Sequence, residues 1–515
     1  MDPIRDVLIV GGGTAGWLTA AFLARALGTS SGDGVRITLV ESSDIAGIGV
    51  GEGTFPSIRG TLATIGIDEA RFLREATATF KQGVRFNDWV RPPGAAGADH
   101  YFHPFSVPSQ RPGGPDLLPY WLLGAAPPGA AFAQASTLQK RVADAGRGPK
   151  RLSDPDFQGP LNYAYHFDAG RFAGLLGRHA LSLGVRHILA TVEGVTLDPG
   201  GAIGAVRTRE AGALRADLYV DCTGFRAALL GAALGSPFRD CRDTLFVDRA
   251  LALQVPYERA DAPIPSYTIS TAREAGWTWD IGLHERRGVG YVYSSRHTDD
   301  ARAEEVLRAA AGPAARGLSA RALRLQVGYR PLQWVHNCVA VGLSAGFVEP
   351  LEASGIGLIE TAAYLLAYLF PADGNTAPAA RQFNAFMRGR FERIVDFVKM
   401  HYCLSRRTDS RFWVENTDPA TVPESLRERL AMWRCRPPHR LDFLTDLEMY
   451  PPSSWQYVLY GMEFATDLSA SRASHPQFER AREEFLALGA VSERALADLP
   501  PHRALVEQMC RRTAA

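Results

Sequence analysis

The sequence DVLIVGGGTAG, from Asp6 to Gly16, decides the fold of this chain. Four consecutive apolar residues, Val7 to Val10, predict a strand that is buried on both faces, as in a parallel sheet. The glycines that follow have the spacing G-x-G-x-x-G, and a helical pattern runs from Trp17 to Ala24. In such a unit the backbone turns tightly against a pyrophosphate, and the helix N-terminus faces its negative charge. The residues assigned to a cofactor here are Gly11, Gly13, Thr14, Ala15 and Gly16.

A second strand, from Arg36 to Val40, ends in an acidic residue, Glu41. A carboxylate at this place can accept a hydrogen bond from an adenosine ribose hydroxyl. The order of strand, motif, helix, strand and acid therefore predicts a dinucleotide site. The alternative is a tight turn between strand and helix that holds no ligand.

Composition excludes several classes of protein. The 515 residues include 56 Lys and Arg against 55 Asp and Glu, so the net charge of +1 gives no electrostatic reason to expect nucleic acid or an anionic membrane as partner. The N-terminus does not read as a signal peptide, and no uncharged apolar run is long enough to span a membrane. The six cysteines lack metal-binding spacing, so we expect reduced thiols in a cytoplasmic protein with no metal site.

Three later segments favour FAD as the dinucleotide. The glycine-rich run that includes Gly49, Val50 and Gly51 suggests backbone close to a ligand, with a flexible loop as the alternative. An apolar strand ending in Asp221-Cys222-Thr223-Gly224 is a second dinucleotide-related signature, and its loop lies over the same cofactor in FAD proteins. The run from Cys338 to Phe347 is a late return of the chain to that site. No second complete fingerprint for NAD(P)H is present.

These features predict an α/β protein with an FAD-dependent monooxygenase-like fold, mixed sheets and a helical C-terminal region. We expect an FAD-binding and catalytic region over residues 1–375. Within it, segments 1–60, 185–230 and 335–375 would bind the dinucleotide and flank a sheet for the substrate. Residues 376–515 would form a helical region that covers the substrate site. Locally, residues 72–81 predict a helix, and residues 377–404 predict a long helix with a core-packing stripe.

Three further motifs carry a resemblance to a known family. They are KQGVRFNDW from Lys81 to Trp89, GWTWDI followed by GYVYSS within residues 276–295, and FVEPLEASGIG from Phe347 to Gly357. Together with the FAD signatures they resemble the flavin-dependent tryptophan halogenase family, over nearly the whole chain.

The resemblance implies a reaction. FADH2, O2 and chloride or bromide would give hypohalous acid, which travels through an internal tunnel to an indole or another electron-rich arene. Lys81 is implied to hold the electrophile, by hydrogen bond or as a haloamine, and Glu352 to assist the lysine or take the proton from the ring. An ammonium donor and a carboxylate base suit these roles. The alternatives are a surface lysine and a structural salt bridge.

The resemblance also assigns the remaining site residues. Halide would bind at Ser354 and Gly355, ahead of a helix expected from Leu358 to Phe370. Trp277 and Trp279 would separate the flavin from the substrate, although core packing is the alternative. The residues implied to contact FAD in these later segments are Val192, Leu343 and Ile356, and those implied to contact the substrate are His103, Phe105 and Trp455.

Two departures from the family pattern bear on the substrate. Gly282 stands where proline is usual after the W-x-W motif. The stretch Ser453 to Leu459 lacks the tyrosine pair and the glutamate that grip the charged ends of tryptophan in tryptophan-specific members. We therefore expect indole or simple indole derivatives to serve at least as well as free tryptophan. A larger indole-bearing molecule stays open.

Two other functions stay open at this stage. An FAD-dependent aromatic hydroxylase would consume NAD(P)H directly and need no halide, and a flavin-binding redox sensor would need no catalytic lysine. Under the main hypothesis a separate NAD(P)H-dependent flavin reductase supplies FADH2, and nucleic acid and membranes are not partners. The oligomeric state stays open between monomer and homodimer.

Overall fold

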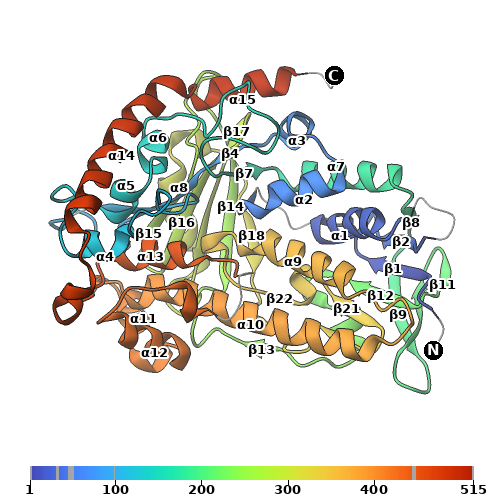
Figure 1. The fold of residues 1–515 in the computed structure, drawn as a ribbon. Coiled ribbons are helices and arrows are strands. Elements are labelled where there is room, and N and C mark those ends of the chain that lie inside the picture. Colours follow the sequence, from blue (N-terminus) through green and yellow to red (C-terminus); the bar gives the residue numbers. More distant parts are fainter. Residues whose placement is uncertain (1–2, 30–33, 45–51, 98, 444–447, 513–515) are drawn as a thin grey trace.

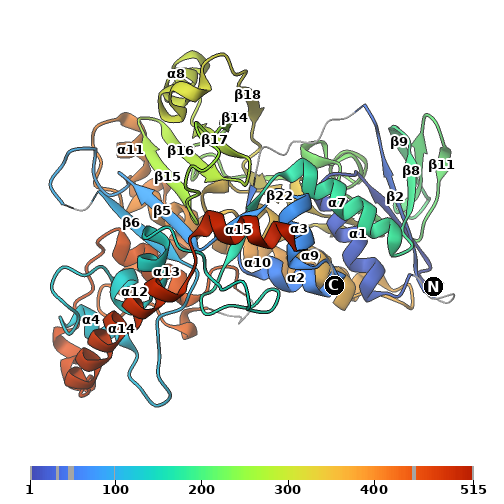
Figure 2. The ribbon, with the colours of Figure 1, turned by 90° about the horizontal axis from the view of Figure 1, so that it is seen from above.

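The computed structural model describes residues 3–29, 34–44, 52–97, 99–443 and 448–512 of the chain (Figure 1). Its helices and mixed sheets confirm the predicted α/β fold. The sheet that contains Asp6 to Val10 lies at one end of the molecule. A long, mostly antiparallel sheet crosses the centre, and helices from the last part of the chain run along the opposite end (Figures 1 and 2).

A six-stranded sheet holds the N-terminal strand near its centre, in the order β20-β21-β12-β1-β2-β8. The strands are β1 (Asp6–Val10), β2 (Arg36–Glu41), β8 (Arg186–Leu189), β12 (Leu218–Asp221), β20 (Trp334–Val335) and β21 (Cys338–Ala340). β1 is parallel to both of its neighbours. Val7 and Ile9 pack in the main core on one face, whereas Leu8 and Val10 pack in a second core on the other. The predicted strand buried on both faces is thus confirmed.

Helices and a small sheet cover this six-stranded sheet. On the main-core side, α1 packs against both α7 and α9. The second core includes residues of η2 and of an antiparallel sheet in the order β11-β10-β9. The bounds are α1 (Thr14–Ala26), α7 (Ala169–Ser182), α9 (Ser354–Tyr368), η2 (Ala228–Ala233), β9 (Val192–Leu197), β10 (Ile203–Thr208) and β11 (Gly212–Leu214).

The central sheet has seven strands in the order β18-β14-β17-β16-β15-β5-β6. Its pairs are antiparallel except for β15 and β5, which are parallel. The strands are β5 (Gly83–Asn87), β6 (His100–Pro104), β14 (Arg249–Pro256), β15 (Thr268–Arg273), β16 (Gly276–Gly282), β17 (Arg286–Tyr293) and β18 (Arg321–Arg324). The W-x-W motif therefore lies in the interior of this sheet, on β16.

The prediction of a helix over residues 72–81 is wrong in its second half. Helix α3 (Glu69–Glu75) ends early, and Thr77 takes a left-handed backbone with φ of 48°. Residues Thr79–Lys81 form β4, which joins β3 (Glu52–Gly53) and β7 (Ala164–Phe167) in the order β3-β7-β4. Pairing with a strand more than eighty residues away decides the conformation here, and no local periodicity records such a partner.

The last part of the chain is mainly helical in its described residues. Its longest helix, α10 (Thr376–Cys403), confirms the prediction over residues 377–404, and its apolar stripe packs in the main core. The other helices there are α11 (Arg411–Asn416), α12 (Glu424–Trp433), α13 (Pro452–Gly461), α14 (Phe478–Asp498) and α15 (His502–Arg511). The division at residue 375 falls between α9 and α10, and it stays a proposal because the main core includes residues on both sides of it.

The remaining elements are short. A three-stranded sheet has the order β13-β19-β22. The strands and helices not yet placed are β13 (Arg239–Asp240), β19 (Gly328–Tyr329), β22 (Gly346–Phe347), α2 (Ser57–Ile65), α4 (Leu117–Leu122), α5 (Phe132–Ser136), α6 (Gln139–Asp144) and α8 (Asp300–Ala311). Eight short η segments include η1 (Gly224–Arg226), η4 (Gly342–Ser344) and η5 (Pro350–Glu352) within the described residues.

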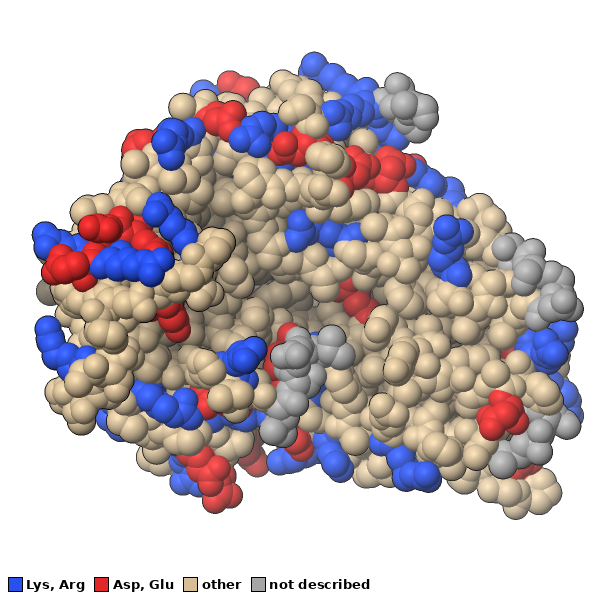
Figure 3. All heavy atoms as spheres, viewed as in Figure 1, with Lys and Arg blue, Asp and Glu red and all other residues tan. Residues whose placement is uncertain are grey.

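Other sequence expectations can be compared with the described part of the chain. There, no helix is long and apolar enough to cross a membrane, and no group of metal-ligating side chains is found. All six cysteines are free thiols. On the face drawn in Figure 3, basic and acidic side chains are interspersed around a hollow whose lining is mostly uncharged.

Candidate functional site

The carboxyl ends of four parallel strands place the predicted dinucleotide residues at one edge of a sheet. The loop from Gly11 to Gly16 follows β1, Glu41 ends β2, the turn at Gly224 follows β12, and Leu343 lies in η4 after β21. Ligands bind at this edge in open α/β sheets. The sequence-predicted segments therefore meet in space, although they span more than three hundred residues.

The glycines of this loop fit a nucleotide. A Cβ at Gly16 would overlap the carbonyl oxygen of Gly11, and one at Gly11 would overlap that of Cys222, so strand, loop and helix pack too closely for side chains. A Cβ at Gly13 would have no neighbour within 4 Å, and the same holds at Gly224 and Gly355. Close packing at the turn with open space above the helix N-terminus suits a pyrophosphate.

The other predicted cofactor residues differ in their surroundings. Glu41 lies beside Gly12, and its Oε1 is 3.0 Å from Nε2 of His187. Both carboxylate oxygens of Asp221 accept hydrogen bonds from the chain itself, from Thr223 and from the backbone N–H groups that begin η2. Asp221 thus shapes the loop. Val192 begins β9, Ile356 is buried in α9, and Gly49, Val50 and Gly51 lie outside the described residues.

Lys81 is the last residue of β4, and its side chain is buried. Its Nζ lies 5.2 Å from the ring centre of Phe105 and 6.0 Å from that of Phe55. Among the described residues, this ammonium makes no hydrogen bond or ion pair. Burial lowers the pKa of Lys81 to about 8, against the opposing effect of Glu352. The lysine is thus a buried donor whose hydrogen-bonding capacity is unused.

The strand that carries Lys81 is fixed by distant parts of the chain. β4 pairs with β7 along one edge, where Lys81 is opposite Ala164. On the other edge, the backbone N–H of Phe80 donates to Nε2 of His502 at 3.1 Å, and Thr79 Oγ1 donates to the carbonyl of Gly282 at 2.6 Å. These contacts hold the two residues that lead to the lysine.

Glu352 is fully buried at the end of η5. Its carboxylate accepts from Nδ1 of His103 at 2.9 and 3.1 Å, and Nε2 of His401 lies 3.2 Å from Oε1. Burial alone would raise the pKa of Glu352, but the two imidazoles outweigh it and lower the pKa to about 2. The carboxylate is therefore ionised at neutral pH and can accept a proton.

Lys81 and Glu352 approach one another around Gly53. A Cβ on Gly53 would lie 3.1 Å from Lys81 Nζ and 3.7 Å from the Cβ of Ala353, the residue after Glu352. Ala353 has a left-handed backbone, φ 53°, which ends η5 and begins α9. The structure therefore places the two sequence-predicted catalytic residues, which lie far apart in the sequence, near the same glycine.

His401 is a residue of the site that no sequence motif predicted. It lies on α10, where Nδ1 contacts the hydroxyl of Tyr101 at 2.6 Å and Nε2 faces Glu352. His401 belongs to a segment whose regularly spaced apolar residues indicated a helix packed in the core and nothing more. A histidine on the buried face of a helix was the available signal, because a buried imidazole needs partners for both nitrogens.

The predicted substrate residues occupy three different settings. His103 is fully buried and uses both ring nitrogens, one on Glu352 and the other on Ser454 Oγ at 2.8 Å. Phe105 packs beside Phe55, with ring centres 5.0 Å apart, and faces Lys81. Trp455 is fully buried on α13, among aromatic rings of Phe397, Trp433 and Phe443.

The predicted halide residues begin a helix. α9 starts at Ser354, four residues before the expected position, because the left-handed Ala353 redirects the chain immediately after Glu352. Ser354 and Gly355 therefore form the first turn, where free backbone N–H groups can bind an anion. A Cβ on Gly355 would meet open space.

Trp277 and Trp279 lie side by side on one face of β16, with ring centres 6.3 Å apart. Trp279 lies across Gly290 of β17, where any side chain would overlap its indole. At the unusual Gly282, a Cβ would be 2.7 Å from Ile264 and 3.0 Å from the hydroxyl of Tyr257. Those two side chains occupy the space next to the position where the family has proline.

The chain is similar to known proteins over most of its length. The family model for tryptophan halogenase matches residues 6–477. Tryptophan 6-halogenase SttH of Streptomyces toxytricini is 39% identical over 477 residues, 88% of each chain, and tryptophan 7-halogenase RebH of Lentzea aerocolonigenes is 35% identical over 520 residues, 95% of each chain. The crystal structure of a tryptophan halogenase from Shewanella frigidimarina superposes with a TM-score of 0.94 and 40% identity, covering 99% of this chain and 98% of that one.

Proposed function

From this similarity we propose how the chain works as a member of the flavin-dependent tryptophan halogenase family, to which it belongs. The enzyme halogenates an indole-type substrate, with Lys81 and Glu352 as its catalytic residues. The cosubstrates would be FADH2, O2 and chloride or bromide. The observation that carries the proposal is the unsatisfied ammonium of Lys81, which lies near an ionised, fully buried Glu352.

Residues at the edge of the six-stranded sheet would hold FAD. The loop from Gly11 to Gly16 and the first turn of α1 would meet the pyrophosphate, and Glu41 would meet the ribose. When bound and reduced, the flavin would supply two of the four electrons that reduce O2, and the halide would supply the other two, so that the products are oxidised flavin, hypohalous acid and water. Ser354 and Gly355, at the positively polarised start of α9, would bind the halide.

At the reacting end, each residue has one task. The Lys81 ammonium donates a hydrogen bond to the hypohalous acid and orients its halogen, since no protein acceptor among the described residues competes for that donor. Phe55 and Phe105 exclude water around it. As the ring carbon bonds the halogen and the oxygen–halogen bond breaks, the hydroxide would leave as water with a proton from Lys81. Glu352 Oε2 or Oε1 would then accept the proton that the halogenated ring carbon releases, while His103 and His401 stabilise the carboxylate before that step.

The proposed substrate is indole or a simple derivative. The stretch from Ser453 to Leu459 forms part of α13, where Ser454 is used by His103 and Trp455 packs in the core. Neither side chain supplies a charged partner for the ammonium or carboxylate of an amino acid, and buried ionic groups need such partners. The intrinsic reactivity of the pyrrole ring would then direct halogenation to C3.

One competition assay tests the function and the substrate together. Enzyme, FAD, a flavin reductase, NADH and O2 are incubated with equal indole and L-tryptophan, in chloride, in bromide and without halide, and products are identified by mass and ring position. We expect halogenated indole to equal or exceed halogenated tryptophan. Preferred halogenation of tryptophan on its benzene ring would contradict the substrate proposal.

The same assay without reductase distinguishes a halogenase from an FAD-dependent aromatic hydroxylase. We expect NADPH alone to leave the flavin absorbance unchanged, because the chain has one complete dinucleotide fingerprint. Rapid bleaching together with a halide-independent hydroxylated product would instead identify an aromatic hydroxylase. A cytoplasmic location and a monomeric or dimeric state belong to the same proposal, and size-exclusion chromatography with light scattering decides the latter.

A further inference from the structure

Glu349 lies three residues before Glu352, yet its side chain has different neighbours. Glu349 is fully buried in the segment that leads into η5. Its Oε1 accepts a hydrogen bond from the hydroxyl of Tyr402 on α10, at 2.7 Å. Glu352 faces His103 and His401 instead. One short turn therefore sends two carboxyl groups into separate environments.

The second oxygen of Glu349 and the indole nitrogen of Trp277 complete no hydrogen bond in the described part of the chain. Trp277 nevertheless lies close enough for its N–H to lower the pKa of the Glu349 carboxyl. A buried polar group without a hydrogen-bond partner is unfavourable. Because these two groups are close together, a small movement of either side chain would join them by a hydrogen bond.

The cation that acts on Glu349, Lys399, does not neutralise it. Lys399 Nζ donates to Asn416 Oδ1 at 3.0 Å and lies 4.9 Å from the ring centre of Phe246. Burial accordingly raises the pKa of Glu349 to about 8, although Tyr402, Trp277 and Lys399 each act to lower it. Tyr402 and Lys399 come from α10, and Trp277 comes from β16.

We propose that Glu349 is a positioning residue that fixes the indole of Trp277 through a carboxyl shared with the hydroxyl of Tyr402. Trp277 packs beside Trp279, whose own ring is held across Gly290. The Trp279 indole is held in the space that the missing side chain of Gly290 leaves. Glu349 would hold the other indole of the pair, that of Trp277. The link to catalysis rests on the proposed function and on the role that the family resemblance implies for the pair, the separation of flavin from substrate, but the contact itself does not.

Fluorine NMR on the flavin-free protein tests the contact directly. The protein is labelled with 5-fluorotryptophan, and the Trp277 resonance is assigned with Trp277→Phe. We expect this resonance to titrate with a midpoint near the Glu349 pKa of about 8, and Glu349→Gln to abolish the titration. A resonance that does not titrate, or a titration that persists in Glu349→Gln, overturns the proposal.

A second variant keeps the test decisive if Glu349→Gln fails to fold. Tyr402→Phe removes a hydrogen bond that favours the ionised carboxyl, so the midpoint should move to higher pH. An unchanged midpoint would contradict the shared contact. The matched control is Glu360→Gln, because Glu360 is another buried acid with a pKa raised by burial, to about 7, but bonds to Ser57 and Thr61. It should leave the Trp277 titration unaltered.

An activity measurement connects the contact to turnover. Glu349→Leu should lower the amount of halogenated product per NADH consumed several-fold, because a displaced Trp277 weakens the separation that the pair provides. Halogenation with wild-type coupling in this variant would overturn that connection. If the wild-type protein makes no halogenated product, the proposed function fails, while the NMR titration still decides whether Glu349 holds Trp277.

Discussion

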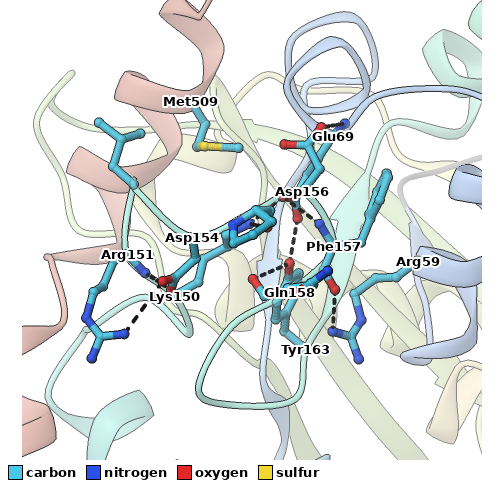
Figure 4. A network of polar contacts seen from close by, with 12 residues as sticks. Arg59, Glu69, Lys150, Arg151, Asp154, Asp156, Phe157, Gln158, Tyr163 and Met509 are labelled. Carbon is cyan, nitrogen blue, oxygen red and sulfur yellow. Dashed lines mark hydrogen bonds and ion pairs between the residues drawn. The ribbon is translucent and has the colours of Figure 1, made fainter.

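Lys150 and Lys81 are both buried and are both influenced by a buried glutamate, but their hydrogen bonding differs completely. Lys150 Nζ contacts Glu69 Oε2 at 2.6 Å and the carbonyl of Pro155 at 2.7 Å (Figure 4). Glu69 also accepts from the hydroxyls of Tyr163 and Tyr165 and from a backbone N–H. Lys81, by contrast, faces two phenylalanine rings and has no polar partner among the described residues.

This difference separates a structural pair from a reactive one. A buried charge is stable only when hydrogen bonds and an opposite charge replace its water. Lys150 and Glu69 have both the opposite charge and the hydrogen bonds within the protein, so the pair holds the segment around residues 150–163 against α3. Lys81 has the influence of an opposite charge but no hydrogen bond within the described residues. A ligand with an acceptor atom can supply that hydrogen bond.

Removing the reactive lysine should have the largest effect. Lys81→Met keeps the length of the side chain and removes the ammonium, and we expect halogenation to fall by about 100-fold to 10,000-fold. FAD binding and oxygen consumption should change little, because Lys81 lies outside the dinucleotide edge. Product mass spectrometry and flavin absorbance check both points. Wild-type halogenation would remove Lys81 from the mechanism, and loss of FAD would make it structural.

Removing the structural lysine should act on stability. Lys150→Met leaves Glu69 buried without its cation, so we expect the free energy of unfolding to fall by about 3–5 kcal/mol. The halogenation rate per folded molecule should be unchanged. Urea unfolding measures the first quantity. A loss of activity without a loss of stability would erase the distinction between the two lysines.

A smaller loss of rate is expected for the carboxylate. Glu352→Gln keeps shape but cannot accept the ring proton or carry charge between His103 and His401, and we expect turnover with saturating indole to fall by about 100-fold. FAD should remain bound. Turnover equal to wild type would show that another group takes the proton.

The smallest effect concerns pH, and it has opposite signs for activity and stability. The pKa of Lys81 is lowered from 10.5 to about 8, so the donating ammonium is lost as pH rises through 8 and halogenation should decline there. Between pH 8 and 10.5 the unfolded chain binds more protons at this site than the folded one, so its contribution to stability should rise. The pH dependence of halogenation and of the free energy of unfolding is measured for wild type and Lys81→Met, and the difference between the two proteins is the contribution of Lys81. If activity and stability changed in the same direction between pH 8 and 10.5, the lowered pKa of Lys81 would be wrong.

Sequence predicted the parts of this structure that depend on local patterns. The apolar run before Gly11 predicted a parallel strand, and the apolar stripe on residues 377–404 predicted a helix. Both predictions succeeded because each pattern lies within one continuous segment. The conformation of β4 and the roles of His401 and Glu69 depend on partners far away in the chain. The resemblance supplied Lys81 and Glu352, but neither motif indicated that one would be unsatisfied and the other held between two imidazoles.

The contact between Phe80 and His502 has a consequence for biosynthesis. It joins the strand of Lys81 to a residue 422 positions later in the chain. Translation proceeds from the N-terminus, and the sheet edge at β21 is likewise made only after residue 338. The reactive lysine thus takes its final place only after α15 has been made, so no ribosome-bound fragment lacking α15 carries the finished site.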